Sequence, residues 1–146
     1  MNHNSISQII LMTQNEAWEM RLVSVRTLDE EAFNEPIDVY SNGRVDFLNG
    51  GEAQLTQRRA LFLSQIINAW VRTDSLRRNG SQLTITDDVC GRCLELEFYS
   101  YHTGDYETLI LWFDEPKDEY GNSTIGQSIL NQIGRFIYDA QQAQNN

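Results

Sequence analysis

Hydrophobic and polar residues alternate over positions 17–26, the first regular pattern in the chain. In an extended strand, Trp18 and Leu22 would lie on one face, and Val23 and Val25 on the other. Because large apolar residues occur on both faces, the pattern predicts a strand that is partly buried on each side.

Two short segments, Ile37–Tyr40 and Arg44–Leu48, flank the triplet Ser41–Asn42–Gly43. Asparagine and glycine adopt positive φ angles more easily than other residues, as the tight turns between antiparallel strands require. The Asn-Gly pair therefore predicts a β-hairpin over these residues.

A long helix is predicted over about residues 52–73, after the break at Gly50–Gly51. Its apolar residues recur at helical spacing, which is typical of an amphipathic helix with one buried face. We expect it to cross a sheet, or to lie between a sheet and a second helix, at the centre of the core. The expected apolar stripe consists of Leu55, Phe62, Ile66, Ala69 and Trp70, widened by Leu63, Ile67 and Val71.

Three further strands are expected at Gln82–Thr86, Cys93–Tyr101 and Tyr106–Phe113. The connections between them are short, so they predict a three-strand meander. Aromatic and aliphatic residues are shared between both faces of 106–113, which predicts a central strand covered by a helix on one side.

A second helix is predicted from Thr124, because this threonine and Gln127 resemble the capping box that begins many helices. The polar tail 141–146 is expected to be frayed. The expected apolar stripe of this helix consists of Ile125, Ile129, Ile133, Phe136, Ile137 and Ala140.

These elements predict a single α+β domain over residues 1–146, with an antiparallel sheet of about five to six strands and both helices packed on one sheet face. The order along the chain is hairpin, long helix, three-strand meander and C-terminal helix. A hydrophobic content of 40% supplies enough apolar material for a core.

The net charge of the chain indicates which kinds of binding partner are disfavoured. The chain carries 21 acidic and 11 basic residues, a formal net charge of −10 at pH 7. This charge repels nucleic-acid phosphates and anionic lipids and favours cations or a basic protein surface, so we expect neither direct nucleic-acid binding nor membrane association. No apolar segment approaches the roughly 20 residues of a membrane span, and the two cysteines form no disulfide framework, so a cytoplasmic location is expected.

The sequence lacks the common catalytic motifs, since it contains no GxSxG, no HExxH and no glycine-rich phosphate loop. Its two histidines, His3 and His102, leave few candidates for a general base near neutral pH. A non-enzymatic protein is therefore the favoured class.

Aromatic residues bordered by acids are typical of protein-binding surfaces, and several gather between positions 99 and 120. We expect an inhibitor, an immunity-type protein or a regulator that is steered to a basic partner by its carboxylates and then buries tyrosines. The sequence leaves open whether it also forms a homodimer. The candidate binding residues are Tyr101, Tyr106, Tyr120, Asp114, Glu115, Asp118 and Glu119.

An alternative function is calcium binding in a regulatory or buffering protein, because Ca²⁺ prefers the carboxylate and carbonyl oxygens of acidic loops. Residues 114–123 do not match an EF-hand loop, since Pro116 and Glu119 occupy positions that require an acid and a glycine. An irregular site is the remaining form of this hypothesis. Its candidate ligands are Asp29, Glu31, Glu35, Asp38, Asp114, Asp118 and Glu119.

Cys90 and Cys93 form a CxxC motif, which could supply half of a zinc site or a redox-active dithiol. In redox proteins the motif opens a helix, whereas Cys93 here precedes the alternating residues of a predicted strand. A zinc site needs two further ligands, which a second copy of the chain could supply. Structural or incidental cysteines in a turn are favoured, and zinc or redox chemistry is a third hypothesis.

Three glutamates, Glu95, Glu97 and Glu107, are expected to share one face of two neighbouring strands. Buried carboxylates in this arrangement could act as an acid–base pair. An arginine on an adjacent strand would instead make them part of a cross-strand ion-pair ladder, which we favour because alternation predicts an exposed face. The candidate arginines are Arg21, Arg26 and Arg92.

Overall fold

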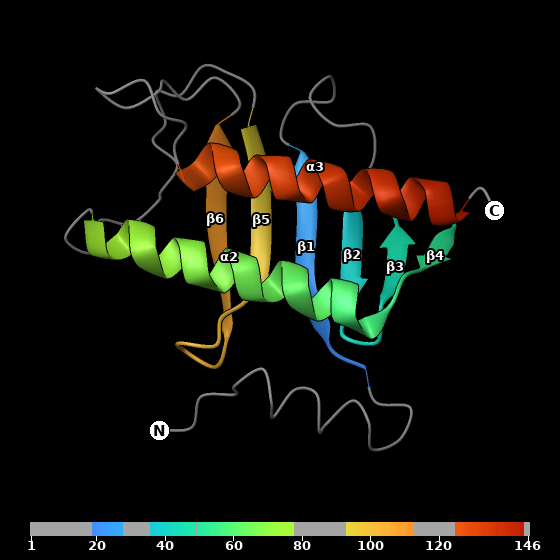
Figure 1. The fold of residues 1–146 in the computed structure, drawn as a ribbon, viewed down its shortest axis with the longest axis horizontal. Coiled ribbons are helices and arrows are strands. Elements are labelled where there is room, and N and C mark those ends of the chain that lie inside the picture. The colour runs from blue at the N-terminus through green and yellow to red at the C-terminus, as the bar shows by residue number, and fades with distance from the viewer. Residues whose placement is uncertain (1–18, 28–35, 49, 78–92, 113–124, 145–146) are drawn as a thin grey trace.

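The computed structural model describes residues 19–27, 36–48, 50–77, 93–112 and 125–144. One antiparallel sheet of six strands and two helices confirm the predicted α+β fold (Figure 1). The elements in chain order are β1 (Arg21–Thr27), β2 (Ile37–Tyr40), β3 (Arg44–Phe47), β4 (Glu52–Gln54), α2 (Gln57–Arg77), β5 (Cys93–Tyr99), β6 (Tyr106–Trp112) and α3 (Ile125–Gln144).

β1 lies inside the sheet with strands on both sides, and every pair of neighbouring strands is antiparallel. From β1 the chain adds β2, β3 and β4 in turn on one side. α2 then crosses the sheet, and β5 and β6 join the other side of β1 (Figure 1). The resulting strand order is β4-β3-β2-β1-β5-β6.

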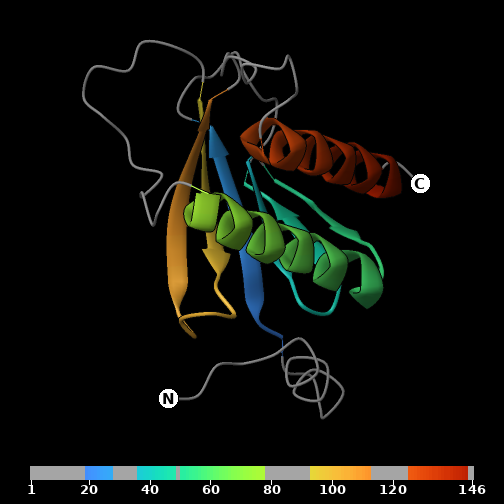
Figure 2. The same ribbon diagram turned by 60° about the vertical axis from the view of Figure 1, so that its left-hand side comes forward.

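Both helices cover the same face of the sheet and run antiparallel to each other across the strands (Figure 1 and Figure 2). β5 shows how the sequence divides its side chains between the two faces. Leu94, Leu96 and Phe98 are buried on the helix side, whereas Glu95 and Glu97 are half-buried on the opposite face. Alternation with period two therefore places the apolar core between the sheet and the helices.

The predicted hairpin is confirmed as β2 and β3, which pair across the turn at Ser41–Gly43. Gly43 has a φ angle of 95°, and a Cβ atom there would lie 2.3 Å from the carbonyl oxygen of Leu55. The Leu55 N–H also donates a hydrogen bond of 2.9 Å to the carbonyl oxygen of Gly43. Both the backbone conformation and this close approach therefore require glycine.

The long helix begins later than predicted, at Gln57 instead of residue 52. Glu52–Gln54 forms β4 and pairs with β3, so sheet pairing overrides the helical preference of this segment. Thr56 then caps the helix, because its Oγ1 accepts a hydrogen bond of 3.2 Å from the N–H of Arg59.

The buried side of α2 also differs from the prediction. Phe62 is 53% exposed and Ala69 is exposed, whereas Ile67 is fully buried. α2 contacts both the sheet and α3, so its buried side is set by the junction of these elements. The buried residues of α2 are Ala60, Leu61, Leu63, Ser64 and Ile67.

Among the described strands β6 lies at the edge of the sheet, and not in the central position that was predicted. The predicted meander is also wrong, because β1 occupies the side of β5 that faces away from β6. The first expected strand of that meander, 82–86, lies outside the described residues. In β6 itself, Leu109 and Leu111 are buried on the helix side, whereas Tyr106 and Thr108 are exposed on the opposite face.

The predicted C-terminal helix is confirmed as α3. It continues through Gln144, with Ala143 packed against the core. The expected fraying of the tail 141–146 stays a prediction. The expected cap of α3, Thr124, and the side chain of Ile125 lie outside the described residues. The other residues of the predicted stripe are all buried: Ile129, Ile133, Phe136, Ile137 and Ala140.

Candidate functional site

The β5–β6 hairpin ends in a loop held by its own hydrogen bonds. The N–H of Ser100 donates to the carbonyl oxygen of Asp105 over 2.8 Å. The buried Oγ of Ser100 accepts hydrogen bonds of 3.2 Å from the N–H groups of both His102 and Thr103. Gly104 completes the loop with a φ angle of 73°. This end of the hairpin is therefore a defined surface.

Asn68 of α2 fastens this hairpin to the helix. Its Nδ2 donates to the carbonyl oxygens of Ser64, at 2.9 Å, and Tyr99, at 3.0 Å. Its Oδ1 accepts a hydrogen bond of 2.9 Å from the N–H of Tyr101. The Tyr101 hydroxyl in turn donates to the Oγ of buried Ser64 over 2.8 Å. Helix and hairpin are thus held at a fixed separation.

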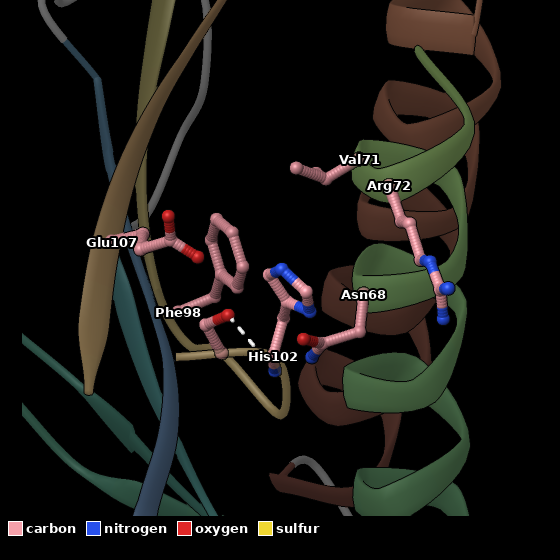
Figure 3. Close-up of a pocket in the computed structure, with 7 residues that line it drawn as sticks. Asn68, Val71, Arg72, Phe98, His102 and Glu107 are labelled. Carbon is pink, nitrogen blue, oxygen red and sulfur yellow. Dashed lines mark hydrogen bonds between the residues drawn. The ribbon is translucent and has the colours of Figure 1, made fainter. Parts of the chain in front are cut away.

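A pocket of about 250 Å³ lies between α2 and the hairpin (Figure 3). Phe98 and Val71 provide apolar surface, while Glu107 projects from β6 and Arg72 lies across the pocket on α2. Neither charged side chain forms an ion pair with another described residue. The geometry suits an extended side chain with an apolar stem and a polar end.

Two of the predicted binding residues, Tyr101 and Tyr106, are bonded through their hydroxyl groups to different elements, α2 and β1. Tyr101 is half-buried beside α2, and burial raises the pKa of its phenol although the hydrogen bond to Ser64 opposes the shift. Tyr106 is 38% exposed, and its hydroxyl donates to the carbonyl oxygen of Arg21 over 2.7 Å. The ring of Tyr99 contacts both tyrosines, with ring centroids 6.4 Å from Tyr101 and 5.7 Å from Tyr106, so the three rings form one cluster.

The remaining predicted partner-binding residues lie outside the described residues. They are Tyr120, Asp114, Glu115, Asp118 and Glu119.

The predicted ion-pair ladder of the three strand glutamates is confirmed for Glu97 only, on the face that the helices do not cover (Figure 1). Arg21 of β1 pairs with Glu97 of β5 and also donates to the Oγ of Ser24. Burial disfavours the charged form of Arg21, but the hydrogen bond and the charge of Glu97 outweigh it and raise the pKa of Arg21. The side chain of Arg21 also stacks over the Tyr106 ring, 4.7 Å from its centroid.

Glu107 does not belong to this ladder, so the prediction that it shares a face with Glu95 and Glu97 is wrong. Glu107 pairs with Phe98 across the β5–β6 register, one position out of phase with the other two glutamates. Because side chains alternate between faces, Glu107 lies on the helix side and borders the pocket.

Asp38 is the only predicted calcium ligand within the described residues, and it takes part in the same network. Its Oδ1 accepts hydrogen bonds from Ser24 Oγ at 2.6 Å and from Arg26 Nη2 at 2.9 Å. A cation at Asp38 would have to compete with Arg26. In the part of the chain that the structure describes, no three potential metal ligands gather at one place. The other predicted ligands are not described: Asp29, Glu31, Glu35, Asp114, Asp118 and Glu119.

Of the CxxC motif, the structure describes the backbone of Cys93 only. Cys93 begins β5 and pairs with Trp112 of β6, as expected for a cysteine that leads into a strand. Cys90 lies outside the described residues, so the zinc and redox hypotheses stay predictions.

Acidic residues concentrate in three connecting segments, 28–35, 78–92 and 113–124. The strands that border these segments meet at one end of the sheet, because Thr27 pairs with Leu94 and Trp112 pairs with Cys93. The three bases of these segments are Arg78, Arg92 and Lys117. Their ten acids are Asp29, Glu30, Glu31, Glu35, Asp87, Asp88, Asp114, Glu115, Asp118 and Glu119.

Sequence reasoning did not identify the pocket, because its lining residues lie far apart in the chain. Phe98 and Glu107 approach through the β5–β6 register, and α2 reaches them only after crossing the sheet. One signal was present: Asn68 is a polar residue next to the core residue Ile67, and a buried amide at such a position usually has hydrogen-bond partners.

No protein family matches the sequence, and neither a curated protein nor a solved structure matches the chain. Within the described ranges, no helix has the length and apolar character that crossing a membrane requires.

Proposed function

We propose that this chain is a non-enzymatic inhibitor or regulator in the cytoplasm that binds a protein with a basic surface. The observation that supports this function is the position of the charge: three strongly acidic segments begin or end at neighbouring strands at one end of the sheet. Within the described strands, by contrast, several acids already pair with arginines, including Asp38 with Arg26 and Glu97 with Arg21.

This distribution favours long-range attraction of a basic partner. Paired carboxylates contribute little to the field of a protein, whereas an excess of carboxylates at one end produces a directed potential. Such a potential raises the association rate more than the final affinity and is screened by salt. Specific affinity then requires contacts of shape and hydrogen bonding with the partner.

The proposal is tested with a fluorescently labelled oligolysine peptide and an oligoglutamate peptide as the charge control. We expect the chain to bind only oligolysine, with an association rate that falls about tenfold or more from low to physiological ionic strength. Neutralising three acids in one connecting segment, as D114N/D118N/E119Q, should slow association further. Stopped-flow anisotropy measures each rate.

The matched control neutralises three acids on the described strands and hairpin, as E52Q/E95Q/D105N. None of these three residues forms an ion pair with a described residue, so both triple variants lose the same charge without breaking such a pair. If both variants slow association equally, net charge and not its position governs binding. A rate insensitive to salt would contradict the proposal as a whole.

A further inference from the structure

The hydrogen bond at the end of the β5–β6 hairpin determines which residues of β6 direct their backbone groups toward β5 and which direct them away. Because Ser100 bonds to Asp105, the next pair, Tyr99 and Tyr106, is a non-hydrogen-bonded pair, and the pattern alternates from there. Every second residue of β6 therefore directs its backbone N–H and C=O away from β5. These residues are Tyr106, Thr108, Ile110 and Trp112, and the N–H of Tyr106 donates to Asp105 Oδ1.

The two edges of the sheet differ in protection. β4 has only three residues, although each of the two edge strands carries one glutamate and is contacted by α3. β6 has seven residues in continuous register with β5, without a bulge, a proline or a lysine. Long regular edges of this kind pair readily with a further strand, and natural proteins usually shorten, charge or cover them. Within the described ranges, β6 has a strand neighbour on one side only.

The C-terminal part of α2 extends past β6 (Figure 1), and Glu107 of β6 lines the pocket. A strand added to this edge would therefore lie beneath the helix. In Figure 3 Glu107 points from β6 toward Phe98 and His102, on the same side as α2. Every second side chain of an added strand would point to this side.

We infer that β6 receives an extended segment of the basic partner as an added antiparallel strand, with a lysine or arginine side chain in the pocket beneath α2. The stem of that side chain contacts Phe98 and Val71, and its charged end pairs with Glu107. Backbone hydrogen bonds to Thr108 and Ile110 supply affinity, and the pocket supplies specificity, as in other cases of strand addition. Arg72, on the opposite wall, repels a cation, so the charged end has to lie on the Glu107 side of the pocket (Figure 3). This inference rests on the proposed function, because it concerns the same basic partner.

The test uses a short peptide in which every second residue is threonine and the residues between are lysine or valine. Two further versions of this peptide are N-methylated on alternate amides. In one version the methyl groups block the amides on the edge of the peptide that would bond to β6. In the other version they block the opposite edge, so the amides that bond to β6 stay free and the charge is the same. We expect the unmodified peptide and the second version to bind and to slow amide hydrogen exchange at Thr108 and Ile110 about tenfold or more. Exchange is measured by NMR on the full chain.

Side-chain recognition is tested by Glu107→Gln, with Glu52→Gln on the opposite edge strand as the matched control. Glu107→Gln should weaken peptide binding about two- to fivefold, the range for a partly exposed ion pair, and Glu52→Gln should leave it unchanged. Equal effects of the two variants would overturn the role of Glu107. Equal binding of both N-methylated peptides would overturn strand addition, while the proposed function would stand if oligolysine still binds.

The experiment also identifies other occupants of the edge. Slow exchange at Thr108 and Ile110 without peptide, independent of protein concentration, would show that the chain covers its own edge and would overturn the inference. Slow exchange that increases with protein concentration would show a second copy there, with the same consequence. If neither this peptide nor oligolysine binds at low salt, the proposed function fails as well.

Discussion

The helix-covered face of the sheet and the opposite face carry different side chains, although the same strands support both. In β5, Leu96 and Phe98 enter the core, while Glu95 and Glu97 lie on the other face. Burying one large apolar side chain contributes about 1.5–3 kcal/mol, whereas a partly exposed ion pair contributes about 0.2–1 kcal/mol. The first face therefore stabilises the fold, and the second mainly favours one strand register over others.

The largest effect should come from the helix-covered face. Ile67→Ala removes a fully buried core side chain of α2 and should lower the free energy of unfolding by about 2–5 kcal/mol. Phe62→Ala, on the same helix but 53% exposed, should lower it by about 1 kcal/mol or less. Urea unfolding followed by circular dichroism measures both. Similar losses would show that the two sides of α2 are not assigned correctly.

A smaller effect is expected from the buried polar centre of the opposite face. Ser24 is 3% exposed, accepts a hydrogen bond from Arg21 and donates to Asp38. Ser24→Ala leaves both partners with one contact fewer and should cost about 1–3 kcal/mol. Thr108→Ala, on the same face but exposed, should cost about 1 kcal/mol or less. If Ser24→Ala is neutral in urea unfolding, this network does not stabilise the sheet.

The ion pair on that face should contribute less again. A double-mutant cycle of Arg21→Gln and Glu97→Gln should give a coupling of about 0.2–1 kcal/mol, because both side chains remain about a third exposed. The coupling should decrease in high salt. A coupling far above this range and unaffected by salt would mean that solvent does not reach the pair. The two faces of the sheet would then contribute more similarly to stability than their exposure indicates.

The smallest effect concerns pH, and it compares Tyr101, whose hydroxyl bonds to α2, with Tyr106, whose hydroxyl bonds to β1. Burial raises the pKa of both Tyr101 and Tyr106, with Ser64 and Arg21 respectively opposing the shift. The folded state therefore keeps the phenol protons to higher pH than the unfolded state does. Their contribution to stability is complete below about pH 10 and is lost as the pH rises through the folded-state pKa values. Thermal unfolding between neutral and alkaline pH measures this loss.

Tyr101→Phe and Tyr106→Phe each remove one titrating proton and should flatten the alkaline loss of stability. Residual pH dependence identical to that of the unchanged chain would show that neither phenol has a raised pKa. The neutral-pH stability of each variant serves as the reference, because both substitutions also remove a hydrogen bond.

Local signals in the sequence predicted the elements whose causes are local. The Asn-Gly turn located β2 and β3, and the 3.6-residue spacing located α3, because turn conformation and helical periodicity depend on nearby residues. The start of α2 was predicted wrongly because β4 exists only through pairing with β3. The position of β6 at the edge depends on β1 occupying the far side of β5, which no local pattern encodes.

The candidate site was predicted only in part for the same reason. Tyr101 and Tyr106 were identified by composition, but their hydrogen bonds to different elements follow from the hairpin register and from Asn68. Glu107 was assigned to the wrong face because the register of β5 with β6 cannot be read from either strand alone. One residue of slip changes the face of every side chain, so a ladder member and a pocket residue look alike in sequence.

The side chain of Asn68 acts on the hairpin as a peptide group would. The carbonyl of Tyr99 and the N–H of Tyr101 point to the same side of an extended chain, where a neighbouring strand would normally present a donor and an acceptor. The single carboxamide of Asn68 supplies both the donor and the acceptor. It therefore bonds to the backbone of the hairpin at Tyr99 and Tyr101 in the way that a neighbouring strand would. Aspartate there would set a carboxylate oxygen against a carbonyl oxygen, and leucine would offer neither donor nor acceptor. The junction of helix and sheet is thus specified by one amide that imitates the backbone.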